Sequence, residues 1–399
     1  MKPELLAPAG TFEKMKTAFR FGADAVYFAG KKFGLRAFAG NFDEEEIEIA
    51  VKYAHKLHKK VYITINILAH EDDFEGLPEY IKYLEKVGVD AVIVADFGIV
   101  NVIKETCPNL EVHISTQANV LNSYAINFLA KMGVKRIILA RELSIEEIKK
   151  IRNKIPKEID LECFVHGAIC ISYSGRCLLS NYLSGRDSNR GACVQACRWK
   201  YCISEISRKD GQKYEIQEDA RGTYILNSKD MCMIKHLKDL EEAGVNSFKI
   251  EGRMKSEYYV ATVVNAYRKA IDQTEDTEIL RAELEKASHR HYTTGFYFPG
   301  EEKECLETSM PIQTHEFVAV VLEDADGEKV KIQQRNRFLK GDVLEVLSPN
   351  QETFNKQIAI NDLKNINNEE VTDAKQVQQT LFLKTNLKLQ EGDILRKKI

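Results

Sequence analysis

The sequence predicts a (β/α)8 barrel of the TIM type with a cysteine-rich insertion, followed by a small C-terminal antiparallel β-barrel domain. A phrase of glycine followed by an apolar run recurs at residues 22–29, 88–95, 133–140 and 244–251. Each copy follows an amphipathic stretch, and glycine commonly ends a helix in the left-handed conformation. A continuous apolar run is typical of a strand buried on both faces, as parallel sheets require.

Four further strand-like runs lie between these phrases, at residues 4–7, 60–65, 110–115 and 159–165. The total of about eight strands, alternating with helices over roughly 250 residues, fits a (β/α)8 barrel. A doubly wound open sheet is the alternative. The barrel is favoured because the phrases are so alike and because no glycine-rich dinucleotide fingerprint follows the first strand.

Residues 170–224 interrupt this alternation and are rich in Ser, Gly, Arg, Asn and Cys. They predict a long insertion after the seventh strand, on the face where barrel enzymes place their active sites. Glycines at positions 167, 175, 185 and 191 give this segment unusual backbone freedom.

The pattern changes after about residue 305. The apolar runs 317–322 and 329–332 flank an Asp-Ala-Asp-Gly turn, which is typical of a β-hairpin. We therefore predict a barrel at residues 1–305, with its insertion at about 166–232, and a β-barrel domain at 306–399.

Composition narrows the class of protein. The chain has 399 residues, 44% of them hydrophobic, and a formal net charge of −3, so the whole molecule has no general electrostatic attraction for nucleic acid. No apolar stretch reaches the roughly 18 residues of a membrane span. The first residues lack the pattern of a signal peptide, so we expect a cytoplasmic protein without a membrane partner.

The nine cysteines are the most unusual feature, because seven of them lie within residues 163–232. In a reducing cytosol this clustering favours metal or redox chemistry over disulfides. Iron–sulfur clusters need converging thiolates. Zinc is the alternative, although the separation of Cys170 from Cys177 is wider than the usual zinc pair. Four cysteines are better interpreted as buried, inert thiols: Cys107, Cys163, Cys202 and Cys305.

The segment 162–170, continuing through 175–180, resembles the signature of the collagenase-like peptidases, family thirty-two of the unclassified peptidases. Residues 4–10, 190–199 and 249–256 also look like that family, so the resemblance covers the chain from end to end. It implies one of two activities. The older is proteolysis; the other is the oxygen-independent hydroxylation performed by tRNA-modifying and ubiquinone-hydroxylating members.

The hydroxylase resemblance implies a 4Fe–4S cluster bound by four cysteines, with prephenate as the probable oxygen source. The ligands map to Cys170, Cys177, Cys193 and Cys232. Cys197 remains a possible substitute, although the second cysteine that accompanies it in some relatives corresponds to Ala39 here. The tRNA-modifying members make 5-hydroxyuridine at the wobble position, which implies tRNA, prephenate and an electron or redox partner.

The residues themselves offer little support for proteolysis. There is no Gly-x-Ser-x-Gly elbow, and the nearest approach to a His-Glu-x-x-His motif, at residues 315–319, lacks the second histidine. His166 and Cys170 could form a Cys–His dyad, but this would remove one cluster ligand. A collagenase-like peptidase and a metal-stabilised RNA-binding protein are therefore the alternatives to a hydroxylase.

Residues just beyond the strand ends are candidates for substrate contacts. Prephenate is a dicarboxylate, and arginine binds carboxylates bidentately, so Arg36, Arg141 and Arg253 are predicted clamps. Structural salt bridges to Glu142 or Glu251 are the alternative. His166 is a predicted proton donor, or else a support for the cysteine loop. The candidate catalytic residues are His166, Arg36, Arg141, Glu251 and Arg253; Asn66, Asp96 and Gln117 also follow strand ends.

The insertion is also locally basic and aromatic. Its cations are Arg176, Arg186, Arg190, Arg198 and Lys200, and they alternate with Tyr173, Tyr182 and Trp199. Such a mixture suits a splayed RNA loop, with phosphates on arginine and bases on aromatic rings. A second basic run lies at residues 329–340, and an ordinary solvated surface is the alternative for both. The sequence thus predicts prephenate-dependent hydroxylation of a tRNA wobble uridine.

Overall fold

The computed structural model describes residues 2–34, 41–199, 218–219, 222–223, 228–300 and 310–399. The chain divides into two compact units. The first comprises residues 1–15, 24–254 and 290–311, and the second residues 16–23, 255–289 and 312–399. The predicted boundary at 305/306 and the predicted site residue Arg36 lie outside the described residues, as do Ala39, Lys200, Cys202 and Cys305.

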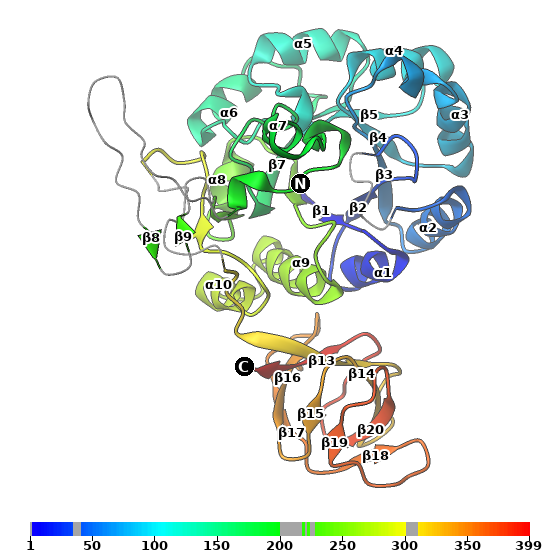
Figure 1. Cartoon of the computed structure of the whole chain (residues 1–399), viewed down its shortest axis with the longest axis vertical. Helices are drawn as coiled ribbons and strands as arrows, with labels where there is room; N and C mark the ends of the chain where they lie inside the picture. Colours follow the sequence, from blue (N-terminus) through cyan, green and yellow to red (C-terminus); the bar gives the residue numbers. More distant parts are fainter. Residues whose placement is uncertain (1, 35–40, 200–217, 220–221, 224–227, 301–309) are drawn as a thin grey trace. The chain divides into compact units, whose positions relative to one another are not determined.

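The first unit is a closed barrel of parallel strands (Figure 1). Its strands, counted within the described residues, are the eight that the sequence predicts: β1 (Glu4–Pro8), β2 (Ala25–Phe28), β3 (Lys60–Ile65), β4 (Ala91–Val94), β5 (Val112–Ile114), β6 (Arg136–Ile138), β7 (Asp160–Ala168) and β11 (Ser247–Ile250). The barrel closes because β11 pairs in parallel with both β1 and β7. This closure confirms the barrel and excludes the open sheet.

Helices surround the strands of the first unit, as Figure 1 shows. They include α2 (Glu44–Lys56), α3 (Leu77–Val87), α4 (Phe97–Thr106), α5 (Ser123–Lys131), α6 (Ile145–Arg152) and α8 (Leu237–Glu242). The recurrent glycine works as the sequence predicts. Gly88 ends α3 at φ 83°, and its N–H donates to the carbonyls of Leu84 and Glu85. No described helix has the length and apolarity that a membrane span requires.

The interior of the barrel is ionic, which the sequence analysis did not anticipate. Arg136 donates to Glu4 and, at 3.2 Å, to Glu162, while Lys249 Nζ lies 2.8 Å from Glu162. Burial opposes the charged form of Glu162, but Lys249 and Arg136 together hold its pKa below the ordinary value. A barrel core is more commonly filled by branched apolar side chains.

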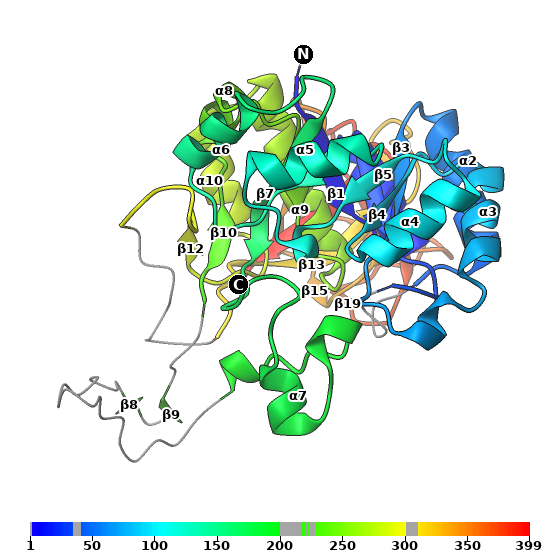
Figure 2. The same cartoon turned by 90° about the horizontal axis from the view of Figure 1, so that it is seen from above.

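The insertion follows β7, as predicted, and is anchored by short elements. The strand β10 (Asp230–Cys232) runs antiparallel to β7, and β12 (Tyr292–Thr293) pairs in parallel with β10. The helix α7 (Leu179–Ser184) lies between β7 and β10 in the sequence. Figures 1 and 2 agree that α7 lies over one end of the barrel. A two-stranded ladder of β8 (Glu218–Asp219) and β9 (Gly222–Thr223) completes the described part.

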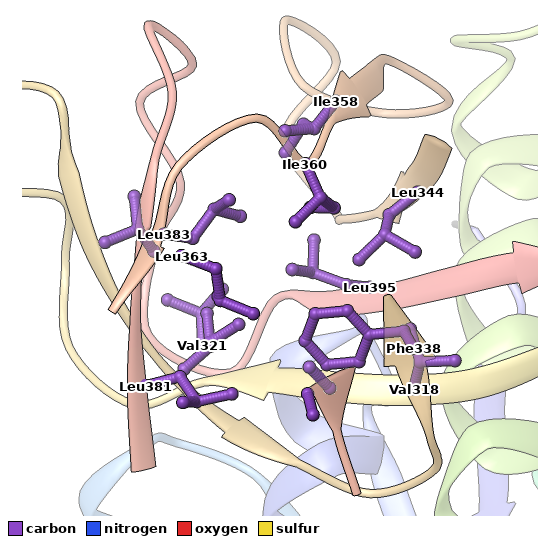
Figure 3. Packing of buried hydrophobic residues seen from close by; sticks show 14 of the residues in the cluster. Val318, Val321, Phe338, Leu344, Ile358, Ile360, Leu363, Leu381, Leu383 and Leu395 are labelled. Carbon is purple, nitrogen blue, oxygen red and sulfur yellow. The ribbon is translucent and has the colours of Figure 1, made fainter. Parts of the chain in front are cut away.

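The second unit contains an antiparallel half-barrel, together with α9 (Glu257–Asp272) and α10 (Thr277–Leu284). Its strand order is β17 (Gln357–Ala359), β16 (Val343–Leu347), β21 (Ile394–Lys398), β13 (His315–Val321), β14 (Lys329–Gln334), β20 (Thr380–Lys384) and β18 (Leu363–Asn365). A short pair, β15 (Phe338–Leu339) and β19 (Asp373–Ala374), lies beside it. Figure 3 shows the apolar core of this unit, with Val318, Phe338 and Leu395 pointing toward one another. The predicted antiparallel domain is thus confirmed, as a half-barrel.

A buried cation connects the sheet of this unit to α10. The Arg396 side chain is fully buried in β21 and donates to Glu283 of α10, at 2.8 Å for the longer contact, and to Glu345 of β16. Burial opposes both charges, yet Arg396 and Lys286 hold the pKa of Glu283 below its ordinary value. The pair therefore stays ionised inside the unit.

Candidate functional site

The carboxyl end of β7 is where three strands meet. His166 is the register partner of Cys232 on β10 and of Ile250 on β11. Its carbonyl accepts the N–H of Glu251 at 2.9 Å, and its buried ring lies 5.4 Å from the ring of Tyr292. The fold therefore places His166 directly beside a predicted cluster ligand.

Gly167 makes this close approach possible. Its φ is +109°, and a Cβ at this position would lie 2.7 Å from the carbonyl oxygen of Glu251. Only glycine adopts such a backbone without strain and leaves room for the neighbouring strand. Gly167, which the sequence analysis relates to backbone freedom, is therefore required by close packing against Glu251.

Arg141, just beyond β6, holds the start of the insertion. Its buried guanidinium donates to the carbonyl of Ala168 at 3.1 Å and to Ser174 Oγ at 2.6 Å. Burial disfavours its charge, but the nearby Cys170 thiol and the Glu251 and Glu142 carboxylates outweigh burial and raise its pKa.

A second anchor comes from the loop after β5. Asn119 Nδ2 donates to the carbonyls of Gln117, at 2.9 Å, and of Ser174, at 3.0 Å. Gly175, at φ +70°, lies so close that an added Cβ would come within 3.1 Å of Gln117 Cβ. Gln117 in turn accepts a hydrogen bond from Asn66 beyond β3. Two predicted barrel-mouth residues, Asn66 and Gln117, are thus brought together beneath the insertion.

Asn119 and Ser174 are site residues that the sequence analysis missed. Asn119 adopts the left-handed conformation at φ 54°, for which asparagine is enriched among non-glycine residues. Its position just after Gln117 was the available signal, but one asparagine in a loop is too common a feature to indicate an anchor.

The remaining predicted mouth residues divide by role. Arg253 is buried and its Nη1 lies 3.3 Å from Thr64 Oγ1 at the end of β3. Glu251 is half-buried beside Gly167. Partial burial raises the pKa of Glu142, although Arg141 lowers it. Asp96 caps α4 by accepting from the N–H groups of Gly98 and Ile99, so it serves the fold.

The cysteines fall into two environments. Cys163 and Cys107 are buried in the core, and burial raises the pKa of Cys163 to about 12 and that of Cys107 to about 11. Both are buried thiols, as predicted, and their inertness stays a prediction. Of the predicted ligands, Cys170 and Cys193 are exposed, Cys177 is half-buried, and Cys232 is buried at the end of β10; the possible substitute Cys197 is also half-buried.

Local hydrogen bonds organise the predicted ligands. Ser180 Oγ, on α7, lies 3.7 Å from Cys193 Sγ, which also accepts the N–H of Gln195 at 3.4 Å. The carbonyl of Cys177 accepts from Ser188 Oγ at 2.6 Å and from Asn189 Nδ2 at 3.1 Å. Cys193 thus contacts the first turn of α7, and Cys177 is held by the short 3-10 turn Ser188–Arg190.

The donor chemistry of these residues fits an iron–sulfur cluster. Thiols are the ligands such clusters take, a buried cation stands at Cys170, and glycines with positive φ at positions 167, 175, 185 and 191 allow the chain to wrap closely. In the part of the chain that the structure describes, no three His, Cys, Asp or Glu side chains converge on a ready-made metal position. The fit is therefore one of residue chemistry and placement on one face.

A closed (β/α)8 barrel whose carboxyl face carries a thiol-bearing insertion defines the general class of this protein. The comparisons then identify the family. The profile described as Peptidase family U32 matches residues 10–307, and that of the Peptidase family U32 C-terminal domain matches residues 313–396. The chain belongs to the peptidase U32 family.

Three of its curated relatives carry names from RNA hydroxylation, whereas a Methanocaldococcus jannaschii relative that is 44% identical over 74% of this chain and 73% of the relative is named an uncharacterized protease. A Bacillus subtilis tRNA hydroxylation protein P1 is 41% identical over 99% of this chain and 95% of the relative. An Escherichia coli tRNA hydroxylation protein P is 38% identical over 87% of this chain and 86% of the relative. An Escherichia coli 23S rRNA 5-hydroxycytidine synthase is 37% identical over 75% of this chain and 43% of the relative.

Proposed function

We propose that this chain is an iron–sulfur enzyme that hydroxylates a tRNA wobble uridine to 5-hydroxyuridine without molecular oxygen, using prephenate. The observation that carries the proposal is the 41% identity to tRNA hydroxylation protein P1 across 99% of the chain. The relative named as a 5-hydroxycytidine synthase supports C5 of a pyrimidine base in RNA as the reacting position. The word peptidase is then a family label.

The proposed cluster ligands are Cys170, Cys177, Cys193 and Cys232. When bound, the cluster would supply a redox-active iron centre at the barrel mouth, tuned by nearby charge and hydrogen bonds. Arg141 holds the backbone of the loop that carries Cys170 through Ala168 and Ser174, and Ser180 Oγ contacts Cys193 Sγ. These contacts orient the ligands, in the way that outer-shell partners generally do at metal sites.

The mouth residues are proposed to bind the co-substrate and to handle protons. Arg253 places a cation beside Thr64, where it can pair with a carboxylate of prephenate. His166 is the register partner of Cys232 on the paired strand, and its imidazole is the proposed proton donor at this site. Arg141 donates to the carbonyl of Ala168 and to Ser174 Oγ, so its proposed role is to hold the start of the insertion.

The first test measures iron, acid-labile sulfide and zinc in anaerobically purified protein. Cys170→Ser and Cys232→Ser are compared with wild type and with Cys107→Ala, a buried thiol outside the site. We expect about four iron atoms and four sulfides per chain in wild type and Cys107→Ala, and loss of both in the two site variants. Zinc, or no metal, in wild type contradicts the cluster.

The second test measures 5-hydroxyuridine formed in tRNA under anaerobic conditions. The assay is run with and without prephenate, and with and without an added redox partner. Product that requires prephenate and is absent from Cys170→Ser supports the proposal. Cleavage of a denatured protein without any nucleoside product would favour the peptidase function. Retained RNA affinity without turnover would favour a metal-stabilised RNA-binding protein.

A further inference from the structure

The α7 region presents several large apolar side chains to solvent. Tyr182 is 87% exposed and Leu178 69% exposed, and Leu183, Tyr173 and Trp199 are each more than 40% exposed. We call these five residues, with the exposed Arg176 and Arg186, the α7 face. Isolated exposed apolar residues are common, but several within one short segment mark a surface that binds something.

The charge of the same segment indicates what that surface binds. Residues 169–199 contain four arginines and a single acidic residue, Asp187, in a chain whose overall net charge is −3. The Asp187 carboxylate already accepts the N–H of Asn189 within its own turn. Cations interleaved with exposed aromatic rings complement a polyanion whose bases are free to stack.

The α7 face is fixed to the candidate site by bonds that the structure shows. Leu178 follows Cys177 directly, and Ser180 Oγ contacts both Cys193 Sγ and the N–H of Val194. Trp199 Nε1 donates to the carbonyl of Val194 at 3.2 Å. A base stacked on this face would therefore be held next to the predicted cluster ligands, on the side of the barrel where α7 lies (Figure 2).

We propose that the α7 face binds a single-stranded loop of RNA, with bases stacked on Tyr182 and Trp199 and phosphates on Arg176 and Arg186. The inference rests on the proposed function and specifies that its RNA substrate is bound as a single-stranded loop. Bases in a duplex stack on one another, whereas loop bases can splay onto an aromatic side chain. The face thus selects a loop and presents one of its bases to the thiol-bearing segment.

The experiment measures binding of the full-length protein to an RNA hairpin and to a fully paired duplex of equal length, by fluorescence anisotropy. Tyr182→Ala is compared with Tyr124→Ala, because Tyr124, on α5, is 85% exposed and lies outside the α7 face. We expect hairpin affinity to fall roughly tenfold or more in Tyr182→Ala, to be unchanged in Tyr124→Ala, and to recover in Tyr182→Trp. Iron content should be equal in all of them.

Salt dependence supplies a second measurement. Loss of one phosphate contact in Arg176→Gln should reduce the slope of log affinity against log salt by about 0.7. Equal binding of hairpin and duplex, or a Tyr182→Ala variant that binds the hairpin as well as Tyr124→Ala does, overturns the inference, as does binding to anionic vesicles without RNA affinity. Hairpin binding that depends on Tyr182, without any 5-hydroxyuridine, keeps the inference and rejects the proposed function.

Discussion

At the scale of single residues, Arg141 shows how the fold changes the interpretation of a motif. The sequence offers it as a clamp for a dicarboxylate. The structure shows its guanidinium donating to the carbonyl of Ala168 and to Ser174 Oγ. The barrel pattern predicts that Arg141 lies just beyond a strand end. Its hydrogen-bond partners belong to the insertion, and the path of the insertion across the barrel mouth cannot be derived from the sequence.

Two glycines in the same region allow a matched test of local strain. Gly167 has φ +109° and an added Cβ would meet Glu251 at 2.7 Å, whereas at Gly185, φ +67°, nothing lies within 4 Å. Gly185→Ala should cost only the backbone penalty of about 1–2 kcal/mol. Gly167→Ala should lower the free energy of unfolding further, because β11 must also move. Urea denaturation measures both, and equal losses would contradict the assigned contact.

At the scale of elements, the barrel strands were predictable because their signal is repeated and strong. Glycine, turn and apolar run recur at four of the eight strands, and Gly88 confirms the physical reason by ending α3 in the left-handed conformation. The strand β10 and the helix α7 were not predicted. They have three and six residues, too short for any periodicity to emerge, and β10 exists because β7 extends beyond the barrel to receive it.

The buried ion pair between Glu283 of α10 and Arg396 of β21 allows a stability prediction for these elements. Glu283→Gln removes the negative charge that Arg396 contacts in a fully buried position. Breaking a buried pair in this way should lower the free energy of unfolding by about 3–5 kcal/mol. Glu278→Gln, on the exposed first turn of α10, is the control and should change it by less than about 0.5 kcal/mol. Chemical denaturation of both variants checks this, and a small effect at Glu283 would mean the pair is dispensable.

At the scale of the whole molecule, the charges buried in both units make stability depend on acid. Glu162 and Glu283 have pKa values below the ordinary glutamate value of about 4.3. Their stabilisation is therefore complete above that pH and is lost as the pH falls through the lower folded-state values. Burial also lowers the pKa of His113, so below about pH 6.5 protons favour the unfolded chain there too.

We thus expect the free energy of unfolding to decline steadily from pH 7 to pH 3. The decline should be shallower in Glu283→Gln, which has one acidic group fewer to protonate. Urea denaturation at half-unit pH intervals measures the slopes. Parallel curves for wild type and variant would show that Glu283 takes no part in the acid sensitivity.

The whole molecule also shows the limits of prediction from sequence. The barrel, the insertion after the seventh strand and the antiparallel C-terminal domain were all accessible, because each has its own local pattern. The ionic interior of Arg136, Glu162 and Lys249 was not, since each residue lies in a different strand and pairs only after closure. The cysteine ligands were located by resemblance, and their convergence stays a prediction.

The pairing of β10 with β7 has a consequence for how such a protein can diversify. Ala168 and Asp230 are register partners, so the insertion leaves the barrel and returns to it at a single point. A loop closed at its base can lengthen at little cost in free energy, about 0.6 kcal/mol for each doubling. The length and surface of the segment can therefore change while the barrel beneath it stays the same.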